Sequence, residues 1–128
     1  MTTSAPDGRT ETLTGALAAI VGARHVTMDA DELRQSLRDV LGLYRTAPLC
    51  MVAPATTQEV AQVVRLCAAH GVPVVPMGGN TGLAGGAVAQ PDGGCVTLSL
   101  RRMRRIREIA PTGQSITVDA GCILAEVQ

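Results

Sequence analysis

The fold of this chain is decided by one glycine-rich stretch, Val74-Val75-Pro76-Met77-Gly78-Gly79-Asn80-Thr81-Gly82-Leu83-Ala84-Gly85-Gly86-Ala87-Val88. Five glycines fall within the nine residues 78–86. Glycine is costly to order and adds no side chain to a core, so this density indicates a backbone that turns sharply or touches something. Successive exposed N–H groups in such a loop form a concavity that binds anions. The stretch therefore predicts a phosphate-binding loop after a short strand, with a flexible surface loop as the alternative.

The residues before the loop predict a strand, a helix and a second strand. Residues 49–53 form an apolar run typical of a strand. Thr56 or Thr57 can begin the helix, since Glu59 follows Thr56 at capping-box spacing, and Gly71 can end it in the left-handed conformation. Residues 72–76 predict the second strand. Because a helical crossover joins the two strands, we expect parallel pairing.

The remaining elements are predicted by shorter patterns. They are a helix over 11–22, an extended piece at 26–28, a short helix capped by Asp29 or Asp31, a strand at 95–100, a hairpin of 105–109 with 115–119, and a helix that begins at 123. The chain ends at Gln128 inside that last amphipathic turn, which predicts a truncated domain.

The composition predicts one folded domain or part of a larger one. Of the 128 residues 46% are hydrophobic, and eleven basic residues balance eleven acidic ones. A net charge of zero gives no preference for polyanions. Apolar residues interrupt the arginine cluster, and aromatic stacking partners are absent, so we interpret it as a solvated face and expect no nucleic acid partner. That cluster comprises Arg101, Arg102, Arg104, Arg105 and Arg107.

The four cysteines lie far apart in apolar surroundings and form no Cys-x-x-Cys or Cys/His group: Cys50, Cys67, Cys95 and Cys122. This spacing predicts buried reduced thiols and no metal site. The sequence shows neither a secretory signal pattern nor an apolar run of transmembrane length. We therefore expect a cytoplasmic protein without a membrane span.

The glycine loop matches neither of the two best-known phosphate-binding patterns. The Walker A pattern requires a lysine, and this chain has none. The Rossmann pattern requires G-x-G-x-x-G at the start of a helix, whereas Pro91 follows Gly86 closely here. Nucleotide hydrolysis and Rossmann-type NAD binding are therefore disfavoured.

Five short motifs follow one another along the chain: A-P-A-T-T-Q-E-V (53–60), V-V-P-M-G-G-N-T-G-L (74–83), G-G-A (85–87), L-S-L (98–100) with Met103 and Ile106, and V-D-A-G (118–121). In this order they resemble the FAD-linked oxidases of the vanillyl-alcohol oxidase or PCMH type. The resemblance extends from Asp39 to the C-terminus. The G-G-N-T-G loop is similar to that of the D-2-hydroxyacid dehydrogenases, which include D-lactate dehydrogenase, the glycolate oxidase flavin subunit and, most similar here, D-2-hydroxyglutarate dehydrogenase.

The resemblance implies an α+β fold, namely the N-terminal portion of a PCMH-type FAD-binding domain. That portion is expected to contain a small β-α-β parallel sheet followed by part of a second, mixed or antiparallel sheet. We expect residues 1–10 to be a disordered leader, 11–48 an N-terminal helical segment, and 49–128 the FAD-binding domain, incomplete at its C-terminus.

The resemblance also implies non-covalent FAD as the cofactor. Backbone N–H groups of residues 76–83 are expected to wrap its pyrophosphate, while Gly85 and Gly86 let the chain pass close to the flavin. Relatives that attach flavin covalently often carry His in this loop, where this chain has Asn80 and Thr81. Much of the family has Arg or Gln at the position of Met77. The predicted cofactor-binding residues are Pro76, Met77, Gly78, Gly79, Asn80, Thr81, Gly82, Leu83, Gly85, Gly86 and Gly121.

The reaction implied for the intact enzyme is oxidation of a D-2-hydroxyacid to a 2-oxoacid by hydride transfer to FAD. The alternatives are another FAD-linked oxidase, with an alcohol or sugar substrate, and a truncated non-catalytic fragment. No catalytic residue and no metal ligand is assigned in this chain, since the resemblance implies that the catalytic residues lie beyond Gln128. The expected partners are a small-molecule substrate and an electron acceptor of unknown identity, with a homo-oligomer left open.

Overall fold

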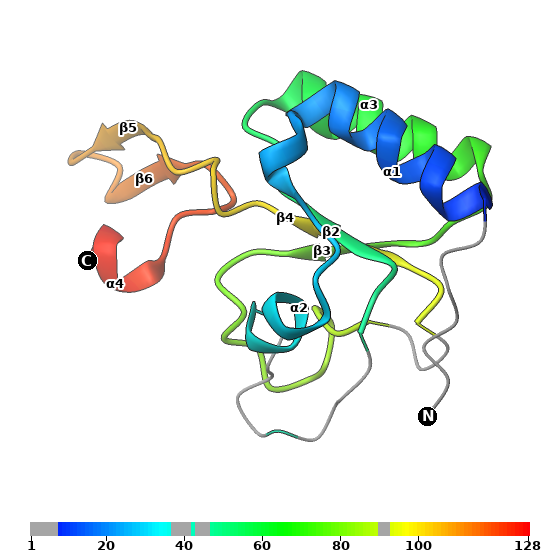
Figure 1. Ribbon diagram of the computed structural model, residues 1–128. Helices are drawn as coiled ribbons and strands as arrows, with labels where there is room; N and C mark the ends of the chain where they lie inside the picture. Colours follow the sequence, from blue (N-terminus) through cyan, green and yellow to red (C-terminus); the bar gives the residue numbers. More distant parts are fainter. Residues whose placement is uncertain (1–7, 37–41, 43–46, 90–92) are drawn as a thin grey trace.

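The computed structural model describes residues 8–36, 42, 47–89 and 93–128. It contains a four-stranded sheet covered on one face by two helices, and a separate two-stranded hairpin (Figure 1). The elements in chain order are α1 (Gly8–Val21), the 3-10 turn η1 (Ala23–His25), β1 (Val26–Thr27), α2 (Ala30–Ser36), β2 (Cys50–Val52), α3 (Thr57–Ala69), β3 (Val74–Met77), β4 (Val96–Ser99), β5 (Ile106–Ala110), β6 (Ser115–Val118) and α4 (Leu124–Val127). This α+β arrangement confirms the predicted fold class.

The strands of the larger sheet lie in the order β1-β2-β4-β3. β2 and β3 each pair in parallel with β4, whereas β1 pairs antiparallel with β2. The strand–helix–strand unit is therefore parallel as predicted, but its two strands do not pair with each other. β4, which comes later in the chain, lies between them.

α3 is the helix that the sequence defines best. Thr56 is its N-cap, and the Thr56 hydroxyl accepts a hydrogen bond of 3.1 Å from the backbone N–H of Glu59. The Glu59 carboxylate in turn accepts one of 2.6 Å from the backbone N–H of Ala55. Gly71, with φ +65°, follows the C-terminal end in the left-handed conformation that glycine adopts at low cost. The predicted helix boundaries are confirmed.

α1 packs against α3, and both cover the same face of the sheet (Figure 1). Their buried side chains form one core with those of β2 and β4: Leu13, Leu17, Val21, Cys50, Val52, Val63, Cys67, Val96 and Leu98. Within the segment predicted as 11–48, α1 thus shares its core with strands and a helix of the predicted FAD-binding domain. α1 also begins at Gly8, so residues 8–10 are helical and not part of a disordered leader. Residues 1–7 lie outside the described part.

The opposite face of the sheet carries a smaller apolar cluster. Leu33 of α2 packs there with Met51, Met77 and Ala87. Asp29 begins α2, because its carboxylate accepts hydrogen bonds of 3.0 Å from the backbone N–H groups of Asp31 and Glu32. This confirms Asp29 rather than Asp31 as the cap.

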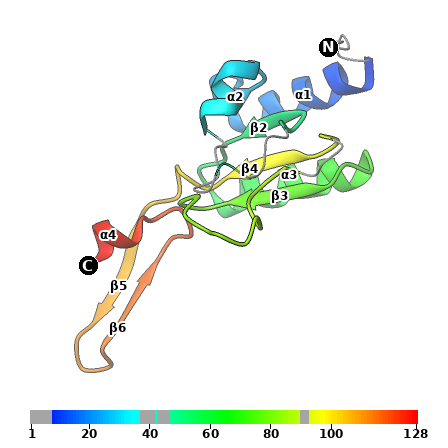
Figure 2. The ribbon, with the colours of Figure 1, turned by 90° about the horizontal axis from the view of Figure 1, so that it is seen from below.

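β5 and β6 form the predicted antiparallel hairpin. It projects away from the larger sheet (Figure 2). Large apolar side chains on it remain in contact with solvent, and Ile109 is 65% exposed. The hairpin therefore stands without an apolar core of its own.

The different burial of the four cysteines predicts that their thiols react differently with alkylating reagents. Cys50, Cys67 and Cys95 are buried and Cys122 is partly exposed, and all four are free thiols. Burial raises the pKa of the Cys50 thiol to about 12, so its reactive thiolate is suppressed at neutral pH. We expect iodoacetamide to modify only Cys122 in the folded protein and all four cysteines in urea, as counted by mass spectrometry. Simultaneous modification of all four without urea would contradict the buried placement.

Candidate functional site

The carboxyl ends of β2, β3 and β4 meet at one edge of the sheet, because these three strands are parallel. The glycine loop begins directly after β3 at Gly78. A turn over residues 100–104 follows β4, and residues 53–58 connect β2 to α3. In open sheets with parallel strands, ligands bind outside this edge. Two cavities lie there.

The first cavity, which we name the loop cavity, has a volume of about 270 Å³. Its lining comes from the end of β3 with the glycine loop, from the end of β4 with the following turn, and from the segment after β6. The lining residues are Met77, Gly78, Gly79, Asn80, Ser99, Arg101, Arg104, Gly121 and Ile123.

Two of the loop residues that line this cavity, Gly78 and Gly79, leave backbone without a side chain. Asn80 has φ +54° and so adopts the left-handed conformation. Asn adopts this conformation more often than most residues other than glycine. A Cβ atom at Gly78 would lie 3.3 Å from the carbonyl oxygen of Ala120, tighter than ordinary packing. Glycine at this position therefore keeps the loop in close contact with the segment after β6.

A second part of the lining belongs to a pair of interlocked turns. In the first turn the N–H of Met103 donates a hydrogen bond of 2.9 Å to the carbonyl of Leu100. The N–H of Gly121 donates one of 2.9 Å to the carbonyl of Met103. A Cβ atom at Gly121 would overlap the carbonyl oxygen of Leu100 and lie 2.7 Å from that of Met103. Gly121 is thus required by close approach between two backbone segments.

Two guanidinium groups give the loop cavity positive character. Arg101 and Arg104 both line it. Arg104 forms an ion pair with Glu126 of α4, and the hydrogen bond that its guanidinium donates to that carboxylate raises the pKa of Arg104. Guanidinium groups and backbone N–H groups are the donors that bind phosphate oxygens. The chemistry of the lining therefore suits an anionic, oxygen-rich group.

The structure gathers part of the predicted cofactor-binding set in the loop cavity. Met77, Gly78, Gly79, Asn80 and Gly121 line it. Six others are not among its lining residues: Pro76, Thr81, Gly82, Leu83, Gly85 and Gly86.

Sequence reasoning missed four lining residues, namely Ser99, Arg101, Arg104 and Ile123. The arginines were interpreted as a solvated face. Four of that cluster's five members are exposed and Arg102 is partly buried, and all five line one of the two cavities. Their position directly after the central strand was the signal that could have identified them, because this is where a parallel sheet binds ligands.

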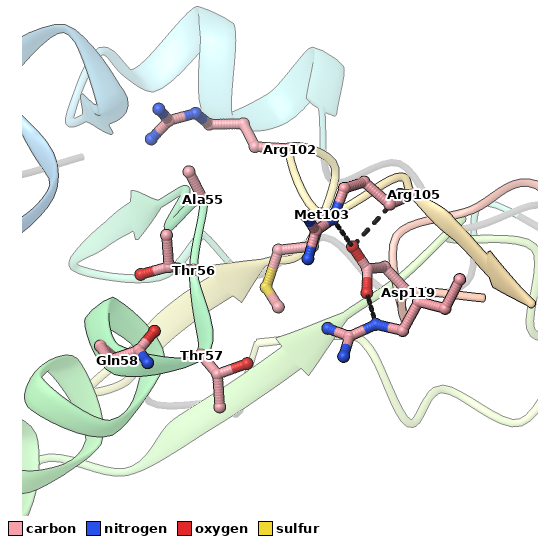
Figure 3. Close-up of a pocket in the computed structure, with 9 residues that line it drawn as sticks. Ala55, Thr56, Thr57, Gln58, Arg102, Met103, Arg105 and Asp119 are labelled. Atoms are coloured by element: carbon pink, nitrogen blue, oxygen red, sulfur yellow. Dashed lines mark hydrogen bonds and ion pairs between the residues drawn. The ribbon is translucent and has the colours of Figure 1, made fainter. Parts of the chain in front are cut away.

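The second cavity has a volume of about 450 Å³ and lies between the start of α3 and the base of the hairpin (Figure 3). Its lining residues are Ala55, Thr56, Thr57, Gln58, Arg102, Met103, Arg105, Arg107 and Asp119. The Arg102 guanidinium donates a hydrogen bond of 2.8 Å to the carbonyl of Ala53, which ties the turn after β4 to the end of β2.

Asp119 is the buried charge of this region. One carboxylate oxygen accepts a hydrogen bond of 2.5 Å from Arg107, and the other accepts one of 3.2 Å from the backbone N–H of Arg105. The hydrogen bond from Arg107 lowers the pKa of Asp119, and the hydrogen bond and charge of Arg105 add to the effect. Asp119 therefore fixes the base of the hairpin two residues before Gly121.

A pH-dependent stability follows from Asp119. Its pKa in the folded protein lies below the usual value of about 3.9, so its contribution is complete above that value and is lost as the pH falls through the folded pKa. We expect Asp119→Asn to lower the urea midpoint at pH 7 and the deficit to shrink toward pH 3. The matched control is Asp31→Asn, because Asp31 forms an exposed ion pair with Arg34. A deficit of equal size at both pH values would contradict the role of the Asp119 charge.

Two further properties bear on the kind of site. Within residues 8–36, 42, 47–89 and 93–128, no three His, Cys, Asp or Glu side chains lie together as a metal ion requires. Of the helices in these ranges, none combines the length and apolar character of a membrane span.

A protein-family model described as an FAD binding domain matches residues 48–128. This chain belongs to that family. The matched range includes every residue that lines the loop cavity. The cavity therefore lies within the part of the chain that the family describes as FAD-binding. FAD is therefore the cofactor of this domain. The residues present fit it, since bare loop backbone and two guanidinium groups face one cavity.

Curated relatives from several organisms are similar to this chain. D-2-hydroxyglutarate dehydrogenase of Arabidopsis thaliana is 35% identical over 105 residues, which is 82% of this chain and 18% of that protein. Glycolate oxidase subunit GlcD of Escherichia coli is 39% identical over 83 residues, 65% of this chain and 16% of that protein. D-lactate dehydrogenase of Anaerostipes hadrus is 35% identical over 76% of this chain and 20% of its own length. The chain thus spans about a fifth of the length of these relatives.

Solved structures share the fold. A crystal structure of p-cresol methylhydroxylase with substrate bound has a TM-score of 0.77 at 21% identity and covers 97% of this chain and 24% of its own. Alkyldihydroxyacetonephosphate synthase has a TM-score of 0.76 at 21% identity and covers 99% of this chain and 25% of its own. These neighbours confirm the PCMH-type fold that the motifs imply.

Proposed function

We propose that this domain holds the pyrophosphate of FAD in the loop cavity, without a covalent bond. The observation that carries the proposal is that loop residues 78–80 meet Arg101, Arg104 and Gly121 around one cavity. The other predicted loop residues, among them Gly85 with φ +75°, shape the path of the loop outside the cavity.

We propose further that the domain serves the oxidation of a D-2-hydroxyacid to a 2-oxoacid. Three relatives with 35–39% identity are named for D-2-hydroxyglutarate, glycolate and D-lactate. When bound, FAD supplies the acceptor for the hydride. The contribution of this chain is to bind and orient the cofactor. The solved neighbours with other substrates share only the fold, so an alcohol or sugar substrate has less support.

The proposed site is tested by flavin binding. We expect the purified protein to bind FAD, to show a higher melting temperature with excess FAD, and to release intact flavin on acid precipitation. Flavin that stays with the precipitated protein would contradict the non-covalent attachment. A protein whose melting temperature FAD does not change would contradict the site itself.

The proposed substrate class is tested separately, by reduction of a dye with D-lactate, glycolate or D-2-hydroxyglutarate in the presence of FAD. Reduction is expected from a protein that spans the full length of the relatives, and the 128-residue chain alone, which covers 18% of the Arabidopsis thaliana relative, is expected to be inactive. The same purified protein can be used to identify the electron acceptor and to measure the oligomeric state. The cytoplasmic location remains a prediction, which cell fractionation can test. The Arabidopsis thaliana relative is named mitochondrial.

A further inference from the structure

Ser99 is the last residue of β4, and its hydroxyl is buried without a partner. The residue is 0% exposed. Within the described part of the chain, Oγ of Ser99 has no hydrogen-bond partner. Most buried polar groups in proteins are hydrogen-bonded, because leaving one unpaired destabilises the fold. The hydroxyl therefore needs an explanation outside the protein's own hydrogen bonds.

The position of Ser99 supplies one. Side chains alternate along a strand, and Val96 and Leu98 of β4 point into the core beneath α1 and α3. Ser99 consequently points to the other face of the sheet, where it lines the loop cavity next to its strand partner Met77. An unpaired hydroxyl thus lies in the wall of the proposed cofactor site.

The surroundings indicate which chemistry would pair with the hydroxyl. Met77 offers no strong hydrogen-bonding group, whereas two guanidinium groups line the same cavity, that of Arg101 and that of Arg104, which is paired with Glu126. A cavity with two guanidinium groups favours negatively charged oxygens. A hydroxyl that donates to a charged oxygen forms a stronger hydrogen bond than one between neutral groups.

We propose that the Ser99 hydroxyl donates a hydrogen bond to a pyrophosphate oxygen of FAD. The inference rests on the proposed function, which places that pyrophosphate in the loop cavity. Ser99 then adds a side-chain donor from the central strand to the backbone donors of the glycine loop.

Thr97 provides a matched control two residues earlier on the same strand. It is also 0% exposed, and in the described ranges its Oγ1 likewise has no hydrogen-bond partner. It faces the same side of the sheet as Ser99 but is not among the lining residues of the loop cavity. Thr97→Val removes a buried unpaired hydroxyl as Ser99→Ala does, but away from the proposed ligand.

The experiment measures binding and stability in the unaltered protein, Ser99→Ala and Thr97→Val. Affinity for FAD is obtained from flavin fluorescence, and affinity for ADP from competition with FAD. We expect Ser99→Ala to weaken the binding of both FAD and ADP about tenfold to a hundredfold, because both carry the diphosphate. Thr97→Val is expected to leave both affinities unchanged. Without ligand, neither substitution is expected to lower the melting temperature, since each removes a hydroxyl that has no partner in the fold.

Each other outcome overturns a defined part of the proposal. Unchanged FAD affinity in Ser99→Ala overturns the role of Ser99 while the proposed site stands. Weaker FAD binding with unchanged ADP binding overturns the pyrophosphate as the partner. A lower melting temperature of ligand-free Ser99→Ala, or an equal loss of affinity in Thr97→Val, overturns a direct contact in favour of a structural role. Failure of the unaltered protein to bind FAD overturns the proposed function, and this inference with it.

Discussion

Replacing Gly121 with alanine is expected to lower the free energy of unfolding by about 3 kcal/mol or more. The new methyl group would overlap the carbonyl oxygen of Leu100, which belongs to the backbone and cannot move aside like the end of a side chain. The two interlocked turns behind the loop cavity must then separate. Because these turns carry Arg101 and Arg104, we also expect weaker FAD binding. Urea unfolding and flavin titration measure the two effects.

Gly113→Ala is the matched control for this substitution. Gly113 lies in the turn between β5 and β6, and a Cβ atom there would meet its nearest neighbour, Oγ of Ser115, at 3.6 Å, an ordinary contact. We expect its effect on stability to stay within about 0.5 kcal/mol and FAD binding to be unchanged. If Gly121→Ala were as stable as Gly113→Ala, the close approach at Gly121 would be refuted.

Leu17→Ala is expected to lower the free energy of unfolding by about 3 kcal/mol, because it removes buried methyl groups and leaves a cavity. Leu17 is 0% exposed in α1 and belongs to the core shared with β2, β4 and α3. A loss of this size in a chain of this length corresponds to a melting temperature lower by on the order of 10 °C. Thermal and urea unfolding, followed by circular dichroism, check the value.

Leu124→Ala makes the same chemical change on a side chain that is 70% exposed in α4. Its effect is expected to stay within about 0.5 kcal/mol. The comparison also tests the domain boundary that the sequence suggested near residue 49. If α1 were a separate segment, Leu17→Ala would leave the urea transition of the remaining structure unchanged. We expect one cooperative transition that shifts as a whole.

Local patterns were enough to predict much of this fold. The apolar spacing and capping of α3, the left-handed Gly71 after it, and the hairpin of β5 and β6 are all visible in the sequence because neighbouring residues determine them. The glycine loop was also predicted from local density, and three of its glycine and asparagine residues, Gly78, Gly79 and Asn80, line the cavity.

Long-range packing explains what the sequence did not reveal. The insertion of β4 between β2 and β3 depends on pairing across many residues, for which no local pattern exists. The same insertion places Ser99 and the two arginines beside the glycine loop. Gly121 was included by resemblance alone, and its physical reason, contact with the Leu100 carbonyl, is a property of the folded backbone.

The central position of β4 has a consequence for how the protein folds during synthesis. Among the described elements, β3 pairs only with β4, so it has no strand partner until residues 96–99 have left the ribosome. Parallel pairing between distant segments is slow, because a long loop must close before any contact forms. The nascent chain must therefore keep two apolar strands apart until a third arrives between them. We expect chains released before residue 96 to lack the parallel part of the sheet and to aggregate, since unpaired strand edges promote association.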